Sequence, residues 1–207
     1  MMSLLLSGDS PVVDTIWGTQ PATMDISAVR YIDCKDSIEG EYTGSGFLIG
    51  DHILATAYHI ASGAKCTDVL TGTPLKTYAT DPKHDFALMT GPGLPTDIPY
   101  VKYSCSRFIP GQPYISYGIS DYMTMKPIVR DNTIYATENM TSNDYEIEGT
   151  PSPGMRVFKG FIAPGMSGGP VTDLEGKAHG VNNAGNRNST IIYELTDTIL
   201  CKVNTSK

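Results

Sequence analysis

The chain is poor in charge and poorest in basic residues. Only 18% of its 207 residues are charged, and 15 Lys and Arg stand against 22 Asp and Glu, which gives a net charge of −7. Affinity for nucleic acid depends largely on neutralising phosphates with Lys and Arg. We therefore expect no nucleic-acid partner.

The amino-terminal stretch lacks the features of a targeting segment. Residues 1–7 contain a run of only three leucines, with no basic residue ahead of it, and Gly-Asp-Ser-Pro follows at residues 8–11. A secretory signal needs a positively charged start and an apolar run of at least about seven residues. A membrane helix needs about 20 apolar residues. We therefore expect no signal peptide, no membrane contact and an intracellular location.

Closely spaced cysteines are also missing. Cys34, Cys66, Cys105 and Cys201 lie singly and far apart, and the four histidines are dispersed as well. Zinc sites usually draw on Cys-x-x-Cys pairs, so no metal is expected. Neither Gly-x-Gly-x-x-Gly nor a P-loop pattern occurs, so no cofactor is expected. Buried free thiols are the simplest interpretation of the cysteines, with up to two disulfides as the alternative.

What the chain does contain is typical of short strands joined by tight turns. It has 21 Gly, 14 Pro and 12 Tyr, and no long run of helix formers. From Ile26 onward, short β-prone runs are separated by Gly, Asp or Ser. Between residues 91 and 113, five prolines predict a crossover between two lobes. We expect an all-β fold preceded by an N-terminal arm over residues 1–24.

The stretch Gly-Met-Ser-Gly-Gly-Pro at residues 165–170 contains the strongest candidate for a catalytic residue. A nucleophilic serine needs a tight, glycine-permitted loop whose backbone N–H groups point at a developing oxyanion. Ser167 is the expected nucleophile, and the N–H groups of Gly165 and Ser167 are the expected oxyanion hole. Taken alone, the stretch also fits a glycine-rich turn with an incidental serine.

Two more residues give this serine a catalytic context. His59 follows an apolar strand expected at residues 53–56, where an imidazole can be partly buried and still meet a substrate as general base. Asp85 begins an apolar run, which suits a carboxylate that must orient an imidazole N–H and stabilise the imidazolium. Asp81 and His84 are nearby rivals, although each precedes the apolar run.

The order His59, Asp85, Ser167 resembles that of the chymotrypsin-like serine peptidases over residues 26–200. The surrounding sequences Gly-Ser-Gly-Phe-Leu-Ile, Thr-Ala-Tyr-His, Asp-Phe-Ala-Leu and Gly-Met-Ser-Gly-Gly-Pro-Val carry the resemblance. It implies two six-stranded antiparallel β-barrels, at residues 25–100 and 101–207, in one structural unit with the site between them. It also implies a serine endopeptidase that acts through an acyl-enzyme. A short closing helix is expected within residues 196–203.

Departures from the digestive enzymes indicate a branch of this family. In zymogen-activated members an Asp directly before the nucleophile pairs with a freed amino terminus, but Met166 stands there in this chain. Ile60 replaces the cysteine that usually follows the catalytic histidine, and the first barrel has short loops. We favour the compact viral proteases that process polyproteins, with a peptide or polyprotein substrate in the host cytoplasm.

Three alternatives to that branch remain open. The first is a bacterial or phage endopeptidase acting on host or misfolded proteins. The second is a non-catalytic barrel that binds peptides in the same cleft. The third is an RNA-binding role for the back of the barrels, which the sparse and scattered Lys and Arg do not support.

The resemblance also places the pocket for the residue before the scissile bond. Members that cut after Glu or Gln usually have His where this chain has Asn182, and members that cut after Arg or Lys have Asp where it has Phe161. A charge buried there without a partner would be costly. We therefore expect the substrate residue before the scissile bond to be uncharged. We expect the side-chain amide of Asn182 or Asn183 to hydrogen-bond an amide side chain of the substrate. The expected substrate-binding residues are Phe161, Ile162, Ala163, Asn182, Asn183 and Ala184.

Overall fold

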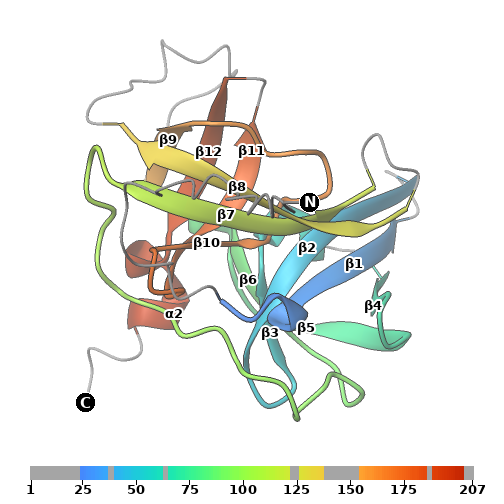
Figure 1. The fold of residues 1–207 in the computed structure, drawn as a ribbon. Helices are drawn as coiled ribbons and strands as arrows, with labels where there is room; N and C mark the ends of the chain where they lie inside the picture. Colours follow the sequence, from blue (N-terminus) through green and yellow to red (C-terminus); the bar gives the residue numbers. More distant parts are fainter. Residues whose placement is uncertain are drawn as a thin grey trace, which may run out of the picture.

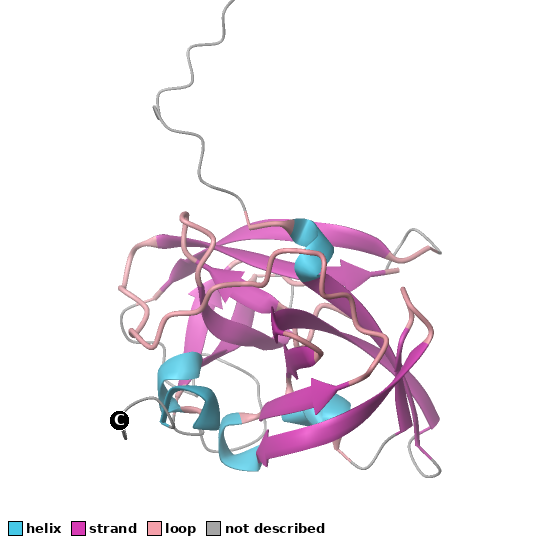
Figure 2. Cartoon of the chain, turned by 90° about the horizontal axis from the view of Figure 1, so that it is seen from below, coloured by secondary structure: helices cyan, strands magenta, loops and turns pink. Residues whose placement is uncertain are grey.

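Two closed antiparallel barrels make up the protein in a computed structural model of the chain (Figure 1). The structure describes residues 24–36, 40–62, 65–121, 126–137, 154–185 and 188–202. Within these residues strands dominate, and the helices are short segments at the edges (Figure 2). The expected all-β, chymotrypsin-like fold of two six-stranded barrels is confirmed.

The first barrel closes in the order β1-β2-β3-β6-β5-β4. Its alternating apolar residues point inward and exclude water, as the period-two pattern of a half-buried strand requires. Phe47, Leu54 and Met89 are among its fully buried side chains. Its strands are β1 (Val29–Asp36), β2 (Gly40–Gly50), β3 (Ile53–Thr56), β4 (Lys65–Asp68), β5 (Thr73–Asp81) and β6 (Phe86–Thr90).

The second barrel closes in the order β10-β11-β12-β9-β8-β7. An aromatic cluster fills one end, where Phe108 meets Tyr114 and Phe158 edge to face with ring centroids 4.7 Å apart in each pair. Its strands are β7 (Pro113–Ser120), β8 (Ile128–Ala136), β9 (Met155–Lys159), β10 (Pro170–Thr172), β11 (Ala178–Gly185) and β12 (Ser189–Glu194).

Short helical segments and one long linker connect the strands. The proline-rich linker, light green in Figure 1, runs from β6 along one side of the molecule to β7. The expected closing helix is present as α2 (Ile199–Lys202). The other helical segments are η1 (Ile26–Ala28), α1 (Tyr58–Ala61), η2 (Pro82–His84) and η4 (Leu195–Asp197). Among the described residues, no helix has the length and apolar character needed to cross a membrane.

The interpretation of the cysteines as free thiols is wrong, because all four form disulfides. Cys34 pairs with Cys66, and Cys105 pairs with Cys201. Cys34 and Cys66 lie directly opposite each other on the antiparallel strands β1 and β4. The second bridge ties the linker to α2. Strand register and helix docking bring these residues together, and neither can be deduced from their spacing in the sequence.

Candidate active site

His59 and Asp85 form one hydrogen-bonded unit at the edge of the first barrel. His59 lies in α1, directly after β3, and Asp85 lies between η2 and β6. The Nδ1 atom of His59 lies 2.7 Å from Oδ2 of Asp85. The backbone N–H of His59 donates to Oδ1 of the same carboxylate at 2.8 Å. One carboxylate oxygen of Asp85 therefore holds the ring of His59, and the other holds its main chain.

The backbone of Asp85 is part of this arrangement. Its φ of 42° lies in the left-handed region, which Asp adopts more readily than most residues do. This conformation ends η2, and the carbonyl oxygen of Asp85 accepts a hydrogen bond from Tyr58 N–H at 3.0 Å. An uncommon backbone conformation is thus stabilised at the position of the expected orienting carboxylate.

The exposure of the two side chains suits different roles. The Asp85 side chain is 12% exposed, whereas that of His59 is 44% exposed. Because a carboxylate accepts at Nδ1, the hydrogen-bond network assigns the proton of a neutral His59 to Nδ1. The lone pair of Nε2 is then available, and Nε2 has no partner among the described residues. His59 can therefore accept a proton on its exposed side.

Ser167 lies in a loop that only glycines can form. Gly165 and Gly168 have φ values of +90° and +87°, which strain any residue with a side chain. A Cβ on Gly168 would also collide with the carbonyl oxygen of Ser45 and the hydroxyl of Thr56. The glycines that suggested a nucleophile loop from the sequence are thus required by backbone conformation and by close packing against the first barrel.

The carbonyl groups before Gly165 and Ser167 are each held by a donor. Ser120 Oγ donates to Pro164 O at 2.6 Å, and Gly169 N–H donates to Met166 O at 3.0 Å. In a planar trans peptide the C=O and the following N–H point in opposite directions. The N–H groups of Gly165 and Ser167 are thereby turned away from these donors. Within the described parts of the chain, neither N–H group makes a hydrogen bond.

Asn183, on β11, contacts two of the three expected catalytic residues. Its Nδ2 donates to Oδ2 of Asp85, and its carbonyl oxygen accepts from Ser167 Oγ at 2.6 Å. Among the described residues, this carbonyl is the only partner of the Ser167 hydroxyl, so the hydroxyl must leave this hydrogen bond before it can give its proton to His59. Catalytic hydrogen bonds often tighten only when substrate is present.

Ser45 fastens the nucleophile loop to the first barrel. Its N–H donates to Ser167 O at 2.7 Å, and its hydroxyl donates to Gly165 O at 2.7 Å. The same hydroxyl accepts from Ile119 N–H on β7 at 2.8 Å. The sequence placed Ser45 near the site through its Gly-Ser-Gly motif but did not predict this role, because the partners lie on the other barrel.

The six expected substrate-binding residues lie in two segments that come together. Ile162 and Ala163 are buried, while Phe161 and Ala184 are exposed. A Cβ on Gly185 would lie 2.9 Å from Cγ1 of Ile162, so the two segments are in close contact.

The side-chain amides of Asn182 and Asn183 both make hydrogen bonds within the protein. Asn182 is fully buried, accepts from Ser116 Oγ at 2.8 Å, and donates to Tyr117 O at 2.8 Å and to Met166 O at 3.3 Å. Asn183 donates to Asp85. Both atoms of the Asn182 amide are therefore engaged within the protein, whereas Asn183 uses its Nδ2 for Asp85. That one of these amides reads the substrate stays a prediction.

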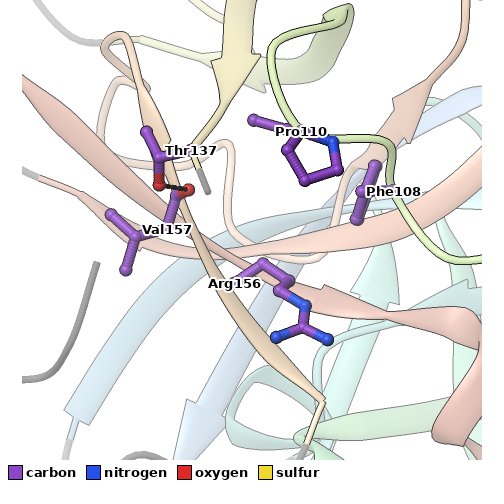
Figure 3. Close-up of a pocket in the computed structure, with 6 residues that line it drawn as sticks. Phe108, Pro110, Thr137, Arg156 and Val157 are labelled. Atoms are coloured by element: carbon purple, nitrogen blue, oxygen red, sulfur yellow. Dashed lines mark hydrogen bonds between the residues drawn. The ribbon is translucent and has the colours of Figure 1, made fainter. Parts of the chain in front are cut away.

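A separate pocket of about 170 Å³ opens on the second barrel (Figure 3). Thr137 Oγ1 donates to the carbonyl oxygen of Val157 at 2.7 Å, and Nε of Arg156 lies 3.3 Å from the buried carboxylate of Glu194. None of the lining residues belongs to the expected catalytic or substrate-binding set. They are Phe108, Pro110, Ala136, Thr137, Arg156 and Val157.

Comparison with protein families identifies the chain. A model described as a trypsin-like peptidase domain matches residues 44–181, a span that includes His59, Asp85 and Ser167. The chain belongs to the trypsin-like peptidase family. This membership supports the sequence-based prediction of a serine endopeptidase. A search of curated proteins found no match to this peptidase.

Solved structures of serine proteases share the peptidase's fold. The active form of the Rv3671c protease from M. tuberculosis has a TM-score of 0.65 and 18% identity, over 94% of this chain and 90% of that one. A human pathogenic astrovirus serine protease has a TM-score of 0.56 and 17% identity, over 86% and 95%. The serine endoprotease from Yersinia pestis has a TM-score of 0.60 and 15% identity, over 90% and 65%. At these identities the likeness concerns the fold.

Proposed function

We propose that this trypsin-like peptidase hydrolyses peptide bonds with Ser167 as nucleophile, His59 as general base and Asp85 as the residue that orients His59. The observation that carries the proposal is the pair of hydrogen bonds, at 2.7 and 2.8 Å, by which one carboxylate fixes the ring and the backbone of His59. Asn183 brings Ser167 to the same carboxylate from the second barrel.

The chemistry follows from these positions. The Ser167 hydroxyl turns from Asn183 O toward Nε2 of His59, gives up its proton there, and its oxygen bonds to the substrate carbonyl carbon. The carbonyl oxygen becomes an oxyanion that the N–H groups of Gly165 and Ser167 stabilise. When the tetrahedral intermediate collapses, the C–N bond breaks and His59 returns its proton to the leaving amine. Water then hydrolyses the acyl-enzyme by the same sequence of steps.

Covalent labelling with a fluorophosphonate tests the proposal without knowledge of the substrate. Ser167 should attack phosphorus and displace fluoride, and mass spectrometry should place the adduct on Ser167. Ser167→Ala should neither label nor cleave peptides while keeping its melting temperature, whereas Ser27→Ala, at an exposed serine, should label normally. A folded wild-type protein that does not label would instead be a non-catalytic barrel.

We further propose that the residue before the scissile bond is uncharged. The segments expected to bound its pocket contribute Phe161, Ile162, Ala163 and Ala184, none of which could pair with a buried charge. Cleavage of a peptide library should therefore show a preference for uncharged residues at this position. A dominant preference for Arg, Lys, Asp or Glu would contradict this specificity.

Polyprotein processing remains our proposed role, with a bacterial or phage endopeptidase as the alternative. The fold is shared with an astrovirus protease and also with bacterial proteases, so it does not separate the two. The two disulfides favour an oxidising compartment over the host cytoplasm that the sequence suggested. Mass spectrometry of the mature termini from the native source should find ends cut by the enzyme's own specificity. Ends that do not match that specificity would contradict self-processing.

A further inference from the structure

Met166, the residue before the expected nucleophile, has a fully buried side chain. It has no exposed surface, and it packs with Ile162 and Ala163 in a small apolar cluster of its own. Its sulfur accepts a hydrogen bond from Ala163 N–H at 3.2 Å, and the side-chain amide of Asn132, on β8, approaches the sulfur at 3.8 Å. The residue before the nucleophile therefore has polar contacts as well as apolar ones.

The two contacts between Met166 and Ala163 close a ring around Gly165. Met166 N–H donates to Ala163 O at 3.1 Å, while Ala163 N–H donates to the Met166 sulfur. Gly165, with its φ of +90°, lies inside this ring. Met166 thus fixes both ends of the turn that contains the Pro164–Gly165 peptide, whose C=O is also held by Ser120 Oγ.

The sulfur also satisfies a buried donor. Ala163 is buried, and in the part of the chain that the structure describes its N–H has no other acceptor. Methionine sulfur is a weak acceptor, but a buried N–H with no acceptor at all is strongly disfavoured. A side chain of similar size without an acceptor at that point would leave the N–H unpaired, and the turn would shift to find another partner.

We propose that Met166 is a positioning residue of the active site. Its thioether holds the 163–167 turn in the shape that presents the Gly165 and Ser167 N–H groups to an oxyanion. The inference rests on the proposed function, since an oxyanion forms only if Ser167 attacks a carbonyl. No charged group takes part in fixing the turn, so the loop needs no ion pair to be preorganised.

Gly118 on β7 leaves room for this arrangement. A Cβ there would lie 2.7 Å from both Cα and Cβ of Met166. Since Gly118 pairs with Arg130 within a regular ladder, its backbone does not require glycine for a turn. The space it provides is occupied by Met166, and adding a methyl group there would displace Met166 without removing its sulfur.

The test compares Met166→Leu with Met89→Leu. Both residues are buried methionines, and Met89 lies in the core of the first barrel, away from the loop. Leucine keeps most of the volume and removes the sulfur, so both variants should lose a few degrees of melting temperature. Only Met166→Leu should lower kcat for peptide cleavage, by about 10- to 100-fold with KM within twofold, because misplacing an oxyanion donor acts on the transition state.

Three further measurements test the positioning role. Selenomethionine-labelled wild-type protein, which keeps an acceptor at residue 166, should retain kcat, and Gly118→Ala should lower kcat as Met166→Leu does. Hydrogen exchange should show a faster-exchanging Ala163 amide in Met166→Leu and an unchanged one in Met89→Leu.

The outcomes distinguish this inference from the proposed function. A wild-type enzyme that neither labels nor cleaves refutes both. An active wild type with Met166→Leu no slower than Met89→Leu overturns the role of Met166 alone. An Ala163 amide equally protected in both variants overturns it too, and this measurement does not depend on activity.

Discussion

Removing the side chain of Asn183 should slow the enzyme without unfolding it. Asn183→Ala deletes the amide that donates to Oδ2 of Asp85, the oxygen that also faces Nδ1 of His59. The backbone carbonyl that accepts from Ser167 is kept. The substitution therefore tests whether the carboxylate needs a donor besides His59 to hold its orientation toward the imidazole.

The size of the effect follows from the hydrogen bond that is lost. A hydrogen bond to a charged group contributes about 1.5–3 kcal/mol, and about 1.36 kcal/mol corresponds to a tenfold change in rate. If this contribution acts mainly when the imidazolium forms, kcat should fall about 10- to 150-fold with little change in KM. The lower end applies if water replaces the amide, but the Asp85 side chain is only 12% exposed.

Steady-state kinetics on a peptide found by library profiling would measure the effect, with fluorophosphonate labelling rates as a second readout. Asn188→Ala is a matched control, because Asn188 precedes β12 and its carbonyl oxygen, which the substitution keeps, accepts from Gly160 N–H. A kcat for Asn183→Ala within twofold of this control, at equal melting temperature, would show that Asp85 is oriented without Asn183.

Two further predictions concern stability. Replacing both Cys105 and Cys201 by Ser should lower the free energy of unfolding by about 4.7 kcal/mol, and removing the first-barrel disulfide should lower it by about 3.7 kcal/mol. The difference comes from loop entropy, because the sequence separations of the two bridges are 96 and 32. Denaturant titration of both double variants would measure the two losses, and the reverse order would contradict this reasoning. Burial raises the pKa of Asp173, but hydrogen bonds from His179 and from backbone N–H groups together bring that pKa below its ordinary value. Asp173 thus adds stability above the unfolded-state pKa that is lost as pH falls through the folded-state pKa, so the melting-temperature deficit of Asp173→Asn should be largest near neutral pH and shrink below about pH 4. A deficit that stays constant across this range would contradict the assignment.

The parts of the site that could be predicted from the sequence are those that depend on a few consecutive residues. The glycines around Ser167 report a backbone conformation that only they adopt, and the apolar run after Asp85 reports a strand. His59 could be proposed as the general base because it lies shortly after a strand. Each of these signals can therefore be recognised in the sequence without knowing how the two barrels pack together.

The parts that sequence could not predict depend on contacts between distant segments. Asn183 was assigned to substrate binding, but its partner Asp85 lies 98 residues away across the two barrels. Cys34 and Cys66 are opposite each other only because β1 and β4 pair in one register. The Asn182 side chain could hydrogen-bond a substrate amide, but it is buried and makes its hydrogen bonds within the protein.

The hydrogen bonds of Ser45 make the final geometry of the loop around Ser167 depend on the docking of the two barrels. One serine from the first barrel holds the carbonyl groups of Gly165 and Ser167 on the second. In a nascent or partly unfolded chain whose barrels have not docked, the loop keeps its contacts within the second barrel but loses both donors from Ser45. We therefore expect full proteolytic activity only after the two barrels have come together.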